Sequence, residues 1–326
     1  MSTVRAFMER HYLHFNARET LSAARAYEAH LAAGGKMMVT LSGAMSTARI
    51  GRILARMIRA DKVHAITCTG ANLEEDIFNL LAANEYEIID DWRGLRAEDE
   101  VALYERGMNR VTDTCIPETV MRHLEERLLR RWREAGEAGV TKLPSEHLYD
   151  VLGEADLPQH FQIPAEDSWM LAAREKGLPV YTPGWEDSTT GNMFAAAAFR
   201  GELPTHTAVA SGTEQMVHLM RWYLANHGAA EGRPSIGFFQ IGGGIAGDFP
   251  ICAVPALIQD LKMEDVPFWG YFSQICDAVT SYGGYSGAVP NEKITWGKLD
   301  KDTPKFMIQS DATIVAPLIF AYLLGD

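Results

Sequence analysis

KMMVTLSGAMSTARIGRILARMIRADKVHAITCTG, residues 36–70, contains the alternation from which the fold can be predicted. It has an apolar run at 36–43, an amphipathic segment at 46–61 and a second apolar run at 62–70. Two short apolar strands joined by a helix of this length indicate a βαβ unit, whose strands run parallel and are buried on both faces. The next segment, 72–83, predicts another helix, so the alternation continues beyond the second strand.

The same alternation returns in the second half of the chain. Strands are predicted at 178–184, 205–210, 235–244, 270–280 and 304–311, and helices at 166–177, 189–201, 213–228, 255–262 and 312–325. Residues 1–33 predict a helical arm that ends at a glycine pair, and 91–165 predict an insertion of helices and loops packed on the sheet. We therefore expect one α/β domain over residues 1–326, with a mainly parallel sheet and helices on both of its faces.

Composition and charge restrict the classes of function. The 326 residues carry a formal net charge of -13 at pH 7, which argues against nucleic-acid binding, since phosphates need a basic face. An acidic surface favours cationic ligands as well as solubility. No uninterrupted apolar stretch approaches the ~20 residues of a membrane span. The charged N-terminus lacks a secretory apolar core, so a cytoplasmic protein is expected. The cysteines and histidines form no metal-ligand pair, and no metal is expected.

Glycines and small polar residues follow several of the predicted strands. These segments are TGANLEED at 69–76, PGWEDSTTGN at 183–192, IGGGIAGD at 241–248 and SDAT at 310–313. Ligands of parallel α/β sheets bind at such strand ends, over helix N-termini. The turn GGGIAG at 242–247 formally matches the dinucleotide pattern G-x-G-x-x-G. No clear acidic partner about 20 residues further on marks a ribose, so the match is weak by itself.

Two acidic clusters have alternative interpretations. The three acids at 74–76 fall at the start of a predicted helix, where carboxylates interact favourably with the helix dipole. One of them could instead hold a ribose hydroxyl or a cationic substrate. Glu186 and Asp187 precede Ser188 and two threonines, which is typical of a helix N-cap but also suits acids that face a polyamine. Local sequence leaves both choices open.

AVPNEKITWGKLD, residues 288–300, predicts a short helix after a loop rich in Gly, Ser and Tyr. Pro290 suits the first turn, and Glu292 and Trp296 are four positions apart and share one face. Lys298 lies just beyond, where a lysine ordinarily complements the C-terminal dipole. Desolvation beside an aromatic wall could instead free its amine as a nucleophile for imine formation. The indole face could also hold a substrate ammonium.

Six segments, in this order, together resemble the deoxyhypusine synthase family: TGANLEED, EDSWMLAA, PGWEDSTTGN, IGGGI, SGAVPNEKITWGK and SDATIVAPLI. They extend over most of the chain, and the pattern S-G-A-x-P-x-E-x-x-x-W-G-K is highly specific. The resemblance implies a Rossmann-like fold, NAD as cofactor, and a homotetramer with active sites between paired subunits.

The resemblance also implies a reaction and a set of site residues. Spermidine is oxidised with NAD, and its aminobutyl group passes through an imine on a lysine, which is Lys298 in this chain. Trp296 would form a wall of the polyamine channel, and Glu292 would hold an amine. The residues expected to contact the cofactor, by the resemblance and, for Gly243, by the glycine pattern, are Thr69, Glu75, Asp187, Gly243, Ser286, Asp311 and Ala312.

The chain departs from the family on its substrate side. The histidine pair expected after the glycines is missing from IAGDFPI at 245–251, and the YGGYSG loop has Tyr282 and Tyr285 at acidic positions. Asn192 stands where an aspartate ends its motif. Tyr285 and Asn192 are therefore predicted to belong to an altered substrate site. The acids that could supply the missing charge are Glu186, Asp248 and Glu292.

Because the substrate side is altered, we expect transfer of an aminobutyl or related alkylamine group to a small amine such as putrescine, which would give homospermidine. A true deoxyhypusine synthase acting on a lysine of translation factor 5A is the first alternative. An NAD-dependent amine dehydrogenase that releases its imine to water, and a polyamine-binding relative without activity, are the others. The expected partners are small polyamines and further copies of the chain, and neither nucleic acid nor a membrane.

Overall fold

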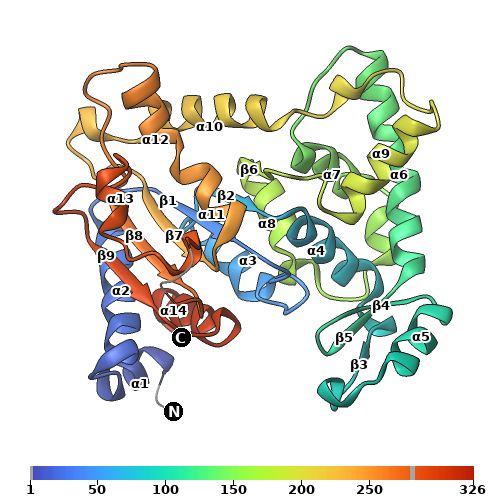
Figure 1. Ribbon diagram of the computed structural model, residues 1–326, viewed down its shortest axis with the longest axis horizontal. Coiled ribbons are helices and arrows are strands. Elements are labelled where there is room, and N and C mark those ends of the chain that lie inside the picture. The colour runs from blue at the N-terminus through green and yellow to red at the C-terminus, as the bar shows by residue number, and fades with distance from the viewer. Residues whose placement is uncertain (1–2, 280–282) are drawn as a thin grey trace.

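The computed structural model describes residues 3–279 and 283–326. Its centre is a six-stranded sheet in which all neighbouring strands are parallel, in the order β6–β2–β1–β7–β8–β9 (Figure 1). The strands are β1 (Met37–Leu41), β2 (Ala65–Cys68), β6 (Val180–Tyr181), β7 (Gly237–Ile241), β8 (Tyr271–Ile275) and β9 (Lys305–Ile308). Numbered along the chain, these strands are arranged 3-2-1-4-5-6, the order of doubly wound nucleotide-binding folds. The predicted α/β class with a parallel sheet is confirmed.

Alternate residues of the central strands face two separate cores. On β1, Met37, Val39 and Leu41 pack into the core on one face of the sheet, and Met38 packs into the core on the other face. Strands β7 and β8 divide their side chains in the same way. Every residue of β1 is therefore buried, which is why its sequence is apolar without the alternation of a half-exposed strand.

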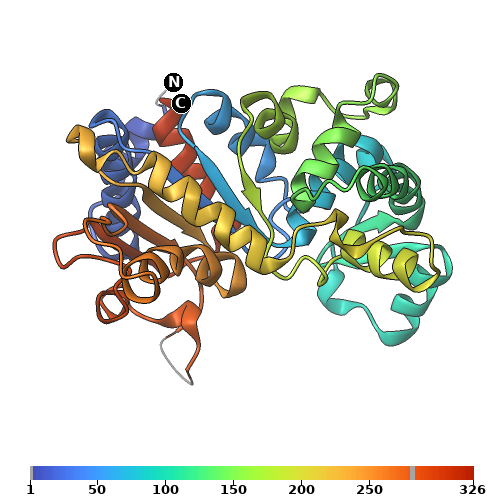
Figure 2. The same ribbon diagram turned by 90° about the horizontal axis from the view of Figure 1, so that it is seen from above.

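Helices cover both faces of the sheet, as Figure 2 shows from above. The first core is covered by α2 (Phe15–Ala32), α3 (Gly51–Arg59), α8 (Trp169–Lys176) and α14 (Ala312–Leu324), and the second by α10 (Gly212–Asn226), α11 (Gly244–Ile251) and α12 (Ala253–Pro255). The other helices are α1 (Val4–His11), α4 (Gly70–Ala82), α5 (Ala97–Glu105), α6 (Glu118–Glu137), α7 (Pro144–Leu152), α9 (Thr189–Phe199) and α13 (Glu292–Thr295). Within residues 3–279 and 283–326, no helix has the length and apolar character needed to cross a membrane.

The N-terminal arm consists of two helices, α1 and α2, where the sequence predicts continuous helix. The chain bends at Phe15, whose φ is 54°. The amide of Arg5 donates a hydrogen bond to the Asp326 carbonyl oxygen over 3.1 Å, and its guanidinium pairs with Glu28 of α2. The first and last helices therefore lie together at one end of the sheet (Figure 1).

Three consecutive carboxylates of α4 are buried, and two of them cap neighbouring helices. Glu74 accepts hydrogen bonds from the first two amides of α9, over 2.9 and 2.7 Å. Asp76 accepts hydrogen bonds from the Ser168 hydroxyl (2.5 Å) and the Met170 amide (3.0 Å) at the start of α8. Amides at helix N-termini have no partner within their own helix, so these carboxylates satisfy them and meet the positive ends of both dipoles. The helix-dipole interpretation thus applies to α8 and α9 and not to α4 itself.

Residues 91–165 belong to a lobe at one end of the molecule, in which α6 is the longest helix (Figure 1). Besides helices, the lobe contains a small antiparallel sheet with the order β3 (Glu87–Ile88), β5 (Thr114–Pro117) and β4 (Met108–Val111). The sequence predicts helices and loops here, so the hairpin β4–β5 is a correction. Its strands have four residues each and turn at Thr112, whose φ is 57°. Strands this short show too few alternations for the pattern to be recognised.

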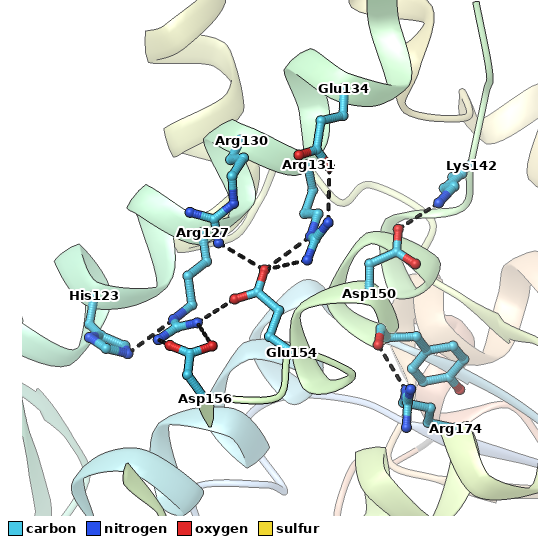
Figure 3. Close-up of polar contacts among 11 residues, drawn as sticks. His123, Arg127, Arg130, Arg131, Glu134, Lys142, Asp150, Glu154, Asp156 and Arg174 are labelled. Carbon is cyan, nitrogen blue, oxygen red and sulfur yellow. Dashed lines mark hydrogen bonds and ion pairs between the residues drawn. The ribbon is translucent and has the colours of Figure 1, made fainter. Parts of the chain in front are cut away.

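The carboxylate of Glu154 joins α6 to the chain that follows α7 (Figure 3). It accepts hydrogen bonds from Arg130 (2.9 Å) and Arg131 (2.7 Å) and also pairs with Arg127, which in turn binds Asp156 over 2.7 Å. Burial by itself would raise the pKa of Glu154, but the hydrogen bonds from the three arginines lower it overall. Removing one partner of such a buried cluster would leave an uncompensated charge, so the cluster holds the lobe in one arrangement.

One other predicted element is wrong. Residues 205–210 form the 3₁₀ turn η5 (His206–Ala208) in place of a strand, followed by an isolated bridge between Val209 and Lys142. Residues 205–210 do not add a strand to the sheet beyond β6. The helix predicted at 255–262 is found in part, because α12 ends at Pro255 and the π-helix η7 (Ala256–Asp260) follows it directly. Helix α11 is not predicted, because its two glycines and Pro250 give a weak helix signal.

Asp76→Ala should lower the free energy of unfolding by about 2–4 kcal/mol, because it leaves the Ser168 hydroxyl and the Met170 amide buried without an acceptor. Urea denaturation followed by tryptophan fluorescence measures the change. The control is Asp302→Ala, since this side chain is 84% exposed and its loss should change stability by less than about 0.5 kcal/mol. An Asp76→Ala protein as stable as the control would contradict the capping role.

Candidate active site

A cavity of about 690 Å³ lies between the α11–η7 segment and residues 283–298. Tyr285, Glu292, Trp296 and Lys298, all predicted as site residues, line it together. Part of its wall is the π-helix η7, and single π-helical turns occur frequently at functional sites. Its volume is in the range of small-molecule sites.

The turn after α13 directs Lys298 back toward this cavity. Gly297 has a φ of 66°, a left-handed conformation that glycine adopts without strain. Its amide donates a hydrogen bond to the Ile294 carbonyl, and the Lys298 amide donates one to the Lys293 carbonyl, each over 3.0 Å. These two bonds define a Schellman motif, which reverses the chain at the end of a helix. The glycine of the W-G-K sequence is thus required by the backbone geometry.

Lys298 is 7% exposed and contacts a carboxylate and two aromatic rings. Its Nζ donates a hydrogen bond to Asp248 Oδ1 over 3.3 Å. The same atom lies 5.2 Å from the centre of the Tyr285 ring and 6.0 Å from that of Trp296. The structure therefore places the predicted aromatic wall beside the lysine, where the ring faces attract a cation.

Three carboxylates face the same cavity. Asp248 comes from α11, Asp260 from the end of η7 and Glu292 from the first turn of α13. Asp248 and Glu292 are two of the acids that the sequence suggests as replacements for the missing family carboxylates. The third, Glu186, lines a different cavity beside α9. Asp260 could not be predicted, because no sequence pattern marks the π-helix that brings it to the cavity.

A second lysine, Lys293, is buried in the same wall and was also missed. It is 2% exposed, and among the residues that the structure describes its Nζ has no hydrogen-bond partner. The Nζ lies 4.7 Å from the centre of the Phe272 ring and 4.9 Å from that of Tyr285. Burial, and then the nearby Lys298 ammonium, lower the pKa of Lys293 to about 8. A sequence signal exists, since a Schellman turn at W-G-K places residues 293 and 298 side by side.

Tyr285 forms a wall shared by the two lysines. Burial raises the pKa of its phenol, so the ring stays neutral at physiological pH. Its hydroxyl lies 3.5 Å from Gln240 Oε1. An uncharged ring therefore stands where the family resemblance predicts an acid. Tyr282, the other tyrosine of this loop, lies outside the described residues.

The glycine turn follows β7 at the point where the strand order reverses, between β1 and β7, which is where doubly wound sheets bind their ligands. A Cβ added to Gly243 would fall 1.8 Å from Ser286 Oγ, so a side chain has no room there. The Ser42 hydroxyl donates a hydrogen bond to the Gly243 carbonyl, and Ser286 Oγ accepts one from the Gly244 amide over 3.2 Å. Helix α11 begins at Gly244. The packing of Ser286 therefore accounts for the glycine at 243, and the start of α11 offers the kind of helix N-terminus that binds phosphate groups.

Three other predicted cofactor residues follow two other strands of the sheet. Thr69 follows β2, caps α4 and donates its hydroxyl hydrogen to the Gly43 carbonyl over 2.7 Å. Asp311 follows β9 and caps α14 by accepting a hydrogen bond from the Thr313 amide over 2.7 Å. Ala312 is the first residue of that helix. These residues lie on the same edge of the sheet as the glycine turn, because all six strands run in one direction.

Glu75 and Asp187 line a second cleft, of about 480 Å³, together with Asn192. Burial raises the pKa of Glu75 to about 7, although hydrogen bonds from Thr47 oppose the shift. Asn192 donates its side-chain amide to two backbone carbonyls at the start of α9, over 2.8 and 2.7 Å. Within one chain, this predicted substrate residue therefore lies with predicted cofactor residues, and in a different cavity from Lys298.

The doubly wound parallel sheet, with a glycine turn at its switch point, defines a Rossmann-like protein, and it carries a lysine-containing cavity beside α11. The family model for deoxyhypusine synthase matches residues 7–323. The chain therefore belongs to the deoxyhypusine synthase family, whose general reaction is NAD-dependent transfer of an aminobutyl group from spermidine.

Relatives and a solved structure agree with this assignment. A deoxyhypusine synthase-like protein of Nostoc punctiforme is 30% identical over 304 residues, which cover 90% of this chain and 73% of that protein. A protein named "Probable deoxyhypusine synthase 2" of Archaeoglobus fulgidus is 26% identical over 289 residues, 89% of this chain and 87% of that protein. The crystal structure of an Entamoeba histolytica protein, provisionally described as a deoxyhypusine synthase, matches with a TM-score of 0.56 at 11% identity, over 95% of this chain and 88% of that chain. The last match shows a shared fold.

Glu75→Gln should stabilise the protein above pH 7 and have little effect near pH 4.5. Burial raises the folded-state pKa of Glu75 from 4.5 to about 7, so between these values the folded chain holds a proton that the unfolded chain has released. The stability contributed by protonated Glu75 is complete below about pH 4.5 and is lost as the pH rises through 7.

The expected gain at pH 8 is about 1–3 kcal/mol, measured as the free energy of unfolding of the variant against the unaltered protein. The control is Glu98→Gln, at an exposed position of α5, which should show no such dependence on pH. A gain from Glu75→Gln of the same size at pH 4.5 and pH 8 would show that burial of its charge is not the cause.

Proposed function

We propose that this protein is an NAD-dependent transferase that moves an aminobutyl or related alkylamine group from a polyamine such as spermidine to a small amine. The observation that carries this proposal is the setting of Lys298, a nearly buried lysine on a cavity that also has three carboxylates and two aromatic rings. A lysine in such a cavity is suited to imine formation with a substrate carbon. Membership of the family supplies the general reaction.

The residues of this chain would bind the amine and carry the group during transfer. When bound, NAD would accept a hydride from the carbon next to the donor nitrogen and return it later. The nitrogen of Lys298 attacks the oxidised carbon, and the bond from that carbon to the leaving diamine breaks. The alkylamine group is then held on Lys298 as an imine until the acceptor amine attacks the same carbon and releases the lysine. Asp248 keeps the Lys298 side chain in place throughout.

The charges of the cavity support a cationic donor. Asp260 and Glu292 lie on different segments of its wall and can each meet a separate ammonium group, and Asp248, which pairs with Lys298, adds a third negative charge to the same wall. The rings of Tyr285 and Trp296 offer faces for methylene groups and for a cation between them. The carboxylates absent from the family positions are thus offset by acids from α11 and η7.

A small acceptor such as putrescine, which would give homospermidine, agrees best with the altered substrate side. The volume of about 690 Å³ leaves room for a diamine next to the bound alkylamine group. A true deoxyhypusine synthase would instead take a lysine of translation factor 5A. An amine dehydrogenase would release its imine to water and accumulate NADH, whereas a transferase returns the hydride.

We also propose a homotetramer with active sites between paired subunits. Trp296 is 66% exposed at the edge of the Lys298 cavity, and an open aromatic surface of this kind is typical of an interface. Glu75 and Asp187 lie in a separate cleft of the same chain. A second copy that covers Trp296 could bring its own cofactor residues to the first copy's lysine.

Incubation with NAD and spermidine, followed by borohydride, should leave a reduced adduct of aminobutyl mass on Lys298, with diaminopropane released. Peptide mass spectrometry locates the adduct. When putrescine is present before the borohydride, the unreduced imine should instead be transferred and appear as free homospermidine. Lys298→Met should abolish the adduct, whereas the control Lys301→Met should leave it unchanged, because Lys301 is 81% exposed. Untouched spermidine would point to a different donor, and lasting NADH to a dehydrogenase. If no amine ever labels Lys298, the enzyme interpretation is wrong.

Mixing two inactive variants tests the shared site. Lys298→Met and Asp187→Ala proteins, refolded or co-expressed together, should regain about a quarter of the unaltered activity, since random pairing gives half of the dimers one intact site of two. Each variant alone should stay inactive, and light scattering should report a tetramer for both. If mixing restores nothing although mixed oligomers form, the two residues act within one chain.

A further inference from the structure

The backbone pairs Lys293 with Lys298. In a Schellman motif, the residue after the left-handed glycine usually packs an apolar side chain on the helix residue five positions earlier. In this chain these two positions are Lys298 and Lys293, joined by the hydrogen bond from the Lys298 amide to the Lys293 carbonyl. Their Nζ atoms lie 5.2 and 4.9 Å from the centre of the same Tyr285 ring, and are thus no more than about 10 Å apart. Two lysines therefore occupy the pair of positions that normally form an apolar contact.

The two amines have different surroundings. Lys298 has Asp248 as an ion-pair partner. The Lys293 Nζ lies between the Phe272 and Tyr285 rings and, in the part of the chain that the structure describes, has no hydrogen-bond partner. The titratable groups that face it are Lys298 and Glu292 from its own segment, Asp248 from α11 and the Tyr285 phenol from η8 (Tyr285–Gly287). Lys298 is therefore held in an ion pair, whereas the pKa of Lys293 is set by burial and by the charges around it.

We propose that Lys293 is the proton acceptor for Lys298: it takes the proton that the Lys298 ammonium must lose before its nitrogen can attack, and later gives it to the departing amine. This proposal rests on the proposed function, in which Lys298 is the nucleophile. Burial lowers the pKa of Lys293 to about 8, so near physiological pH it can both accept and donate a proton, as a general base must. The positive charge of Lys298 contributes to this lowering, because two nearby cations repel each other.

The steps balance with a single positive charge throughout. A proton moves from the Lys298 Nζ through a water to the Lys293 Nζ, which leaves a lone pair on Lys298. A bond then forms between the Lys298 nitrogen and the imine carbon of the oxidised donor. The leaving nitrogen takes one proton from the attacking nitrogen and a second from Lys293, and its bond to the carbon breaks. Lys298 ends as a protonated imine, the leaving amine and Lys293 end uncharged, and Lys293 is ready for the return transfer.

The first test uses the unaltered protein. Trace acetylation with acetic anhydride between pH 6 and 11, read by peptide mass spectrometry, gives the titration midpoint of each lysine without any substrate. Lys293 should titrate near pH 8, about two pH units below the ordinary value of a lysine. Lys301, whose side chain is 81% exposed, is the internal control. If Lys293 titrates together with Lys301, the proposal is wrong.

The second test follows the reaction of Lys298 with butyraldehyde in the presence of cyanoborohydride, from pH 6 to 10. In the unaltered protein, the alkylation rate of Lys298 should rise with an inflection near pH 8. Lys293→Met, which packs well between aromatic rings, and Lys293→Arg, which keeps the charge but cannot give up its proton, should both lose this inflection. At pH 8 both should alkylate Lys298 at least about tenfold more slowly.

The two variants separate the possible outcomes. A normal profile for Lys293→Arg would mean that Lys293 contributes charge alone, and a normal profile for Lys293→Met would mean no contribution; either overturns the proposal. Thermal unfolding of both variants checks that they are folded. Alkylation of Lys293 in place of Lys298 would reverse the roles and overturn it too. If the unaltered protein shows no alkylation of Lys298 at any pH, both the role of Lys293 and the proposed function are wrong. Equal alkylation rates in all three proteins would refute only the role of Lys293.

Discussion

Burial of the parallel sheet on both faces is the constraint from which the site follows. Parallel strands need a crossover that packs on the sheet, and each crossover returns the chain to the same starting edge. All six strands therefore end at one edge, and the segments that follow them meet there. Met37 and Met38 illustrate the constraint, because these neighbours on β1 enter different cores. The glycine turn after β7 and the capping residues Thr69 and Asp311 share an edge for this reason, although they are far apart in the sequence.

The chemistry of the cavity depends on how it divides positive charge between two lysines. Asp248 compensates Lys298, whereas aromatic rings surround Lys293. Tyr285, which stands where the family pattern has an acid, is one of the rings that surround Lys293. An aspartate in place of Tyr285 would stand beside the Lys293 amine and hold it as an ammonium by ion pairing. The neutral phenol ring leaves Lys293 free to titrate, so the altered substrate side also alters the surroundings of the reactive amine.

Much of the fold was predictable because it depends on local patterns. The strand predicted at 36–43 and the helix predicted at 312–325 have long apolar runs. The structure has them at Met37–Leu41 and Ala312–Leu324, close to the predicted bounds. Elements that lack such runs were missed or misassigned. The hairpin at 108–117 is too short to show a period, α11 contains helix-weakening glycines, and residues 205–210 have no place in the sheet. In each case tertiary contacts outweigh a weak local preference.

The sequence by itself determined the parallel α/β class, the glycine turn and the grouping of Glu292, Trp296 and Lys298, since these depend on residues that are close along the chain. It could not determine what surrounds the lysines. Asp248 is 50 residues from Lys298, and the burial of Lys293 comes from the packing of β8 and η8 against α13. Whether a lysine amine is charged or reactive depends on desolvation and on nearby charges, and both are set by groups that come together only when the chain has folded.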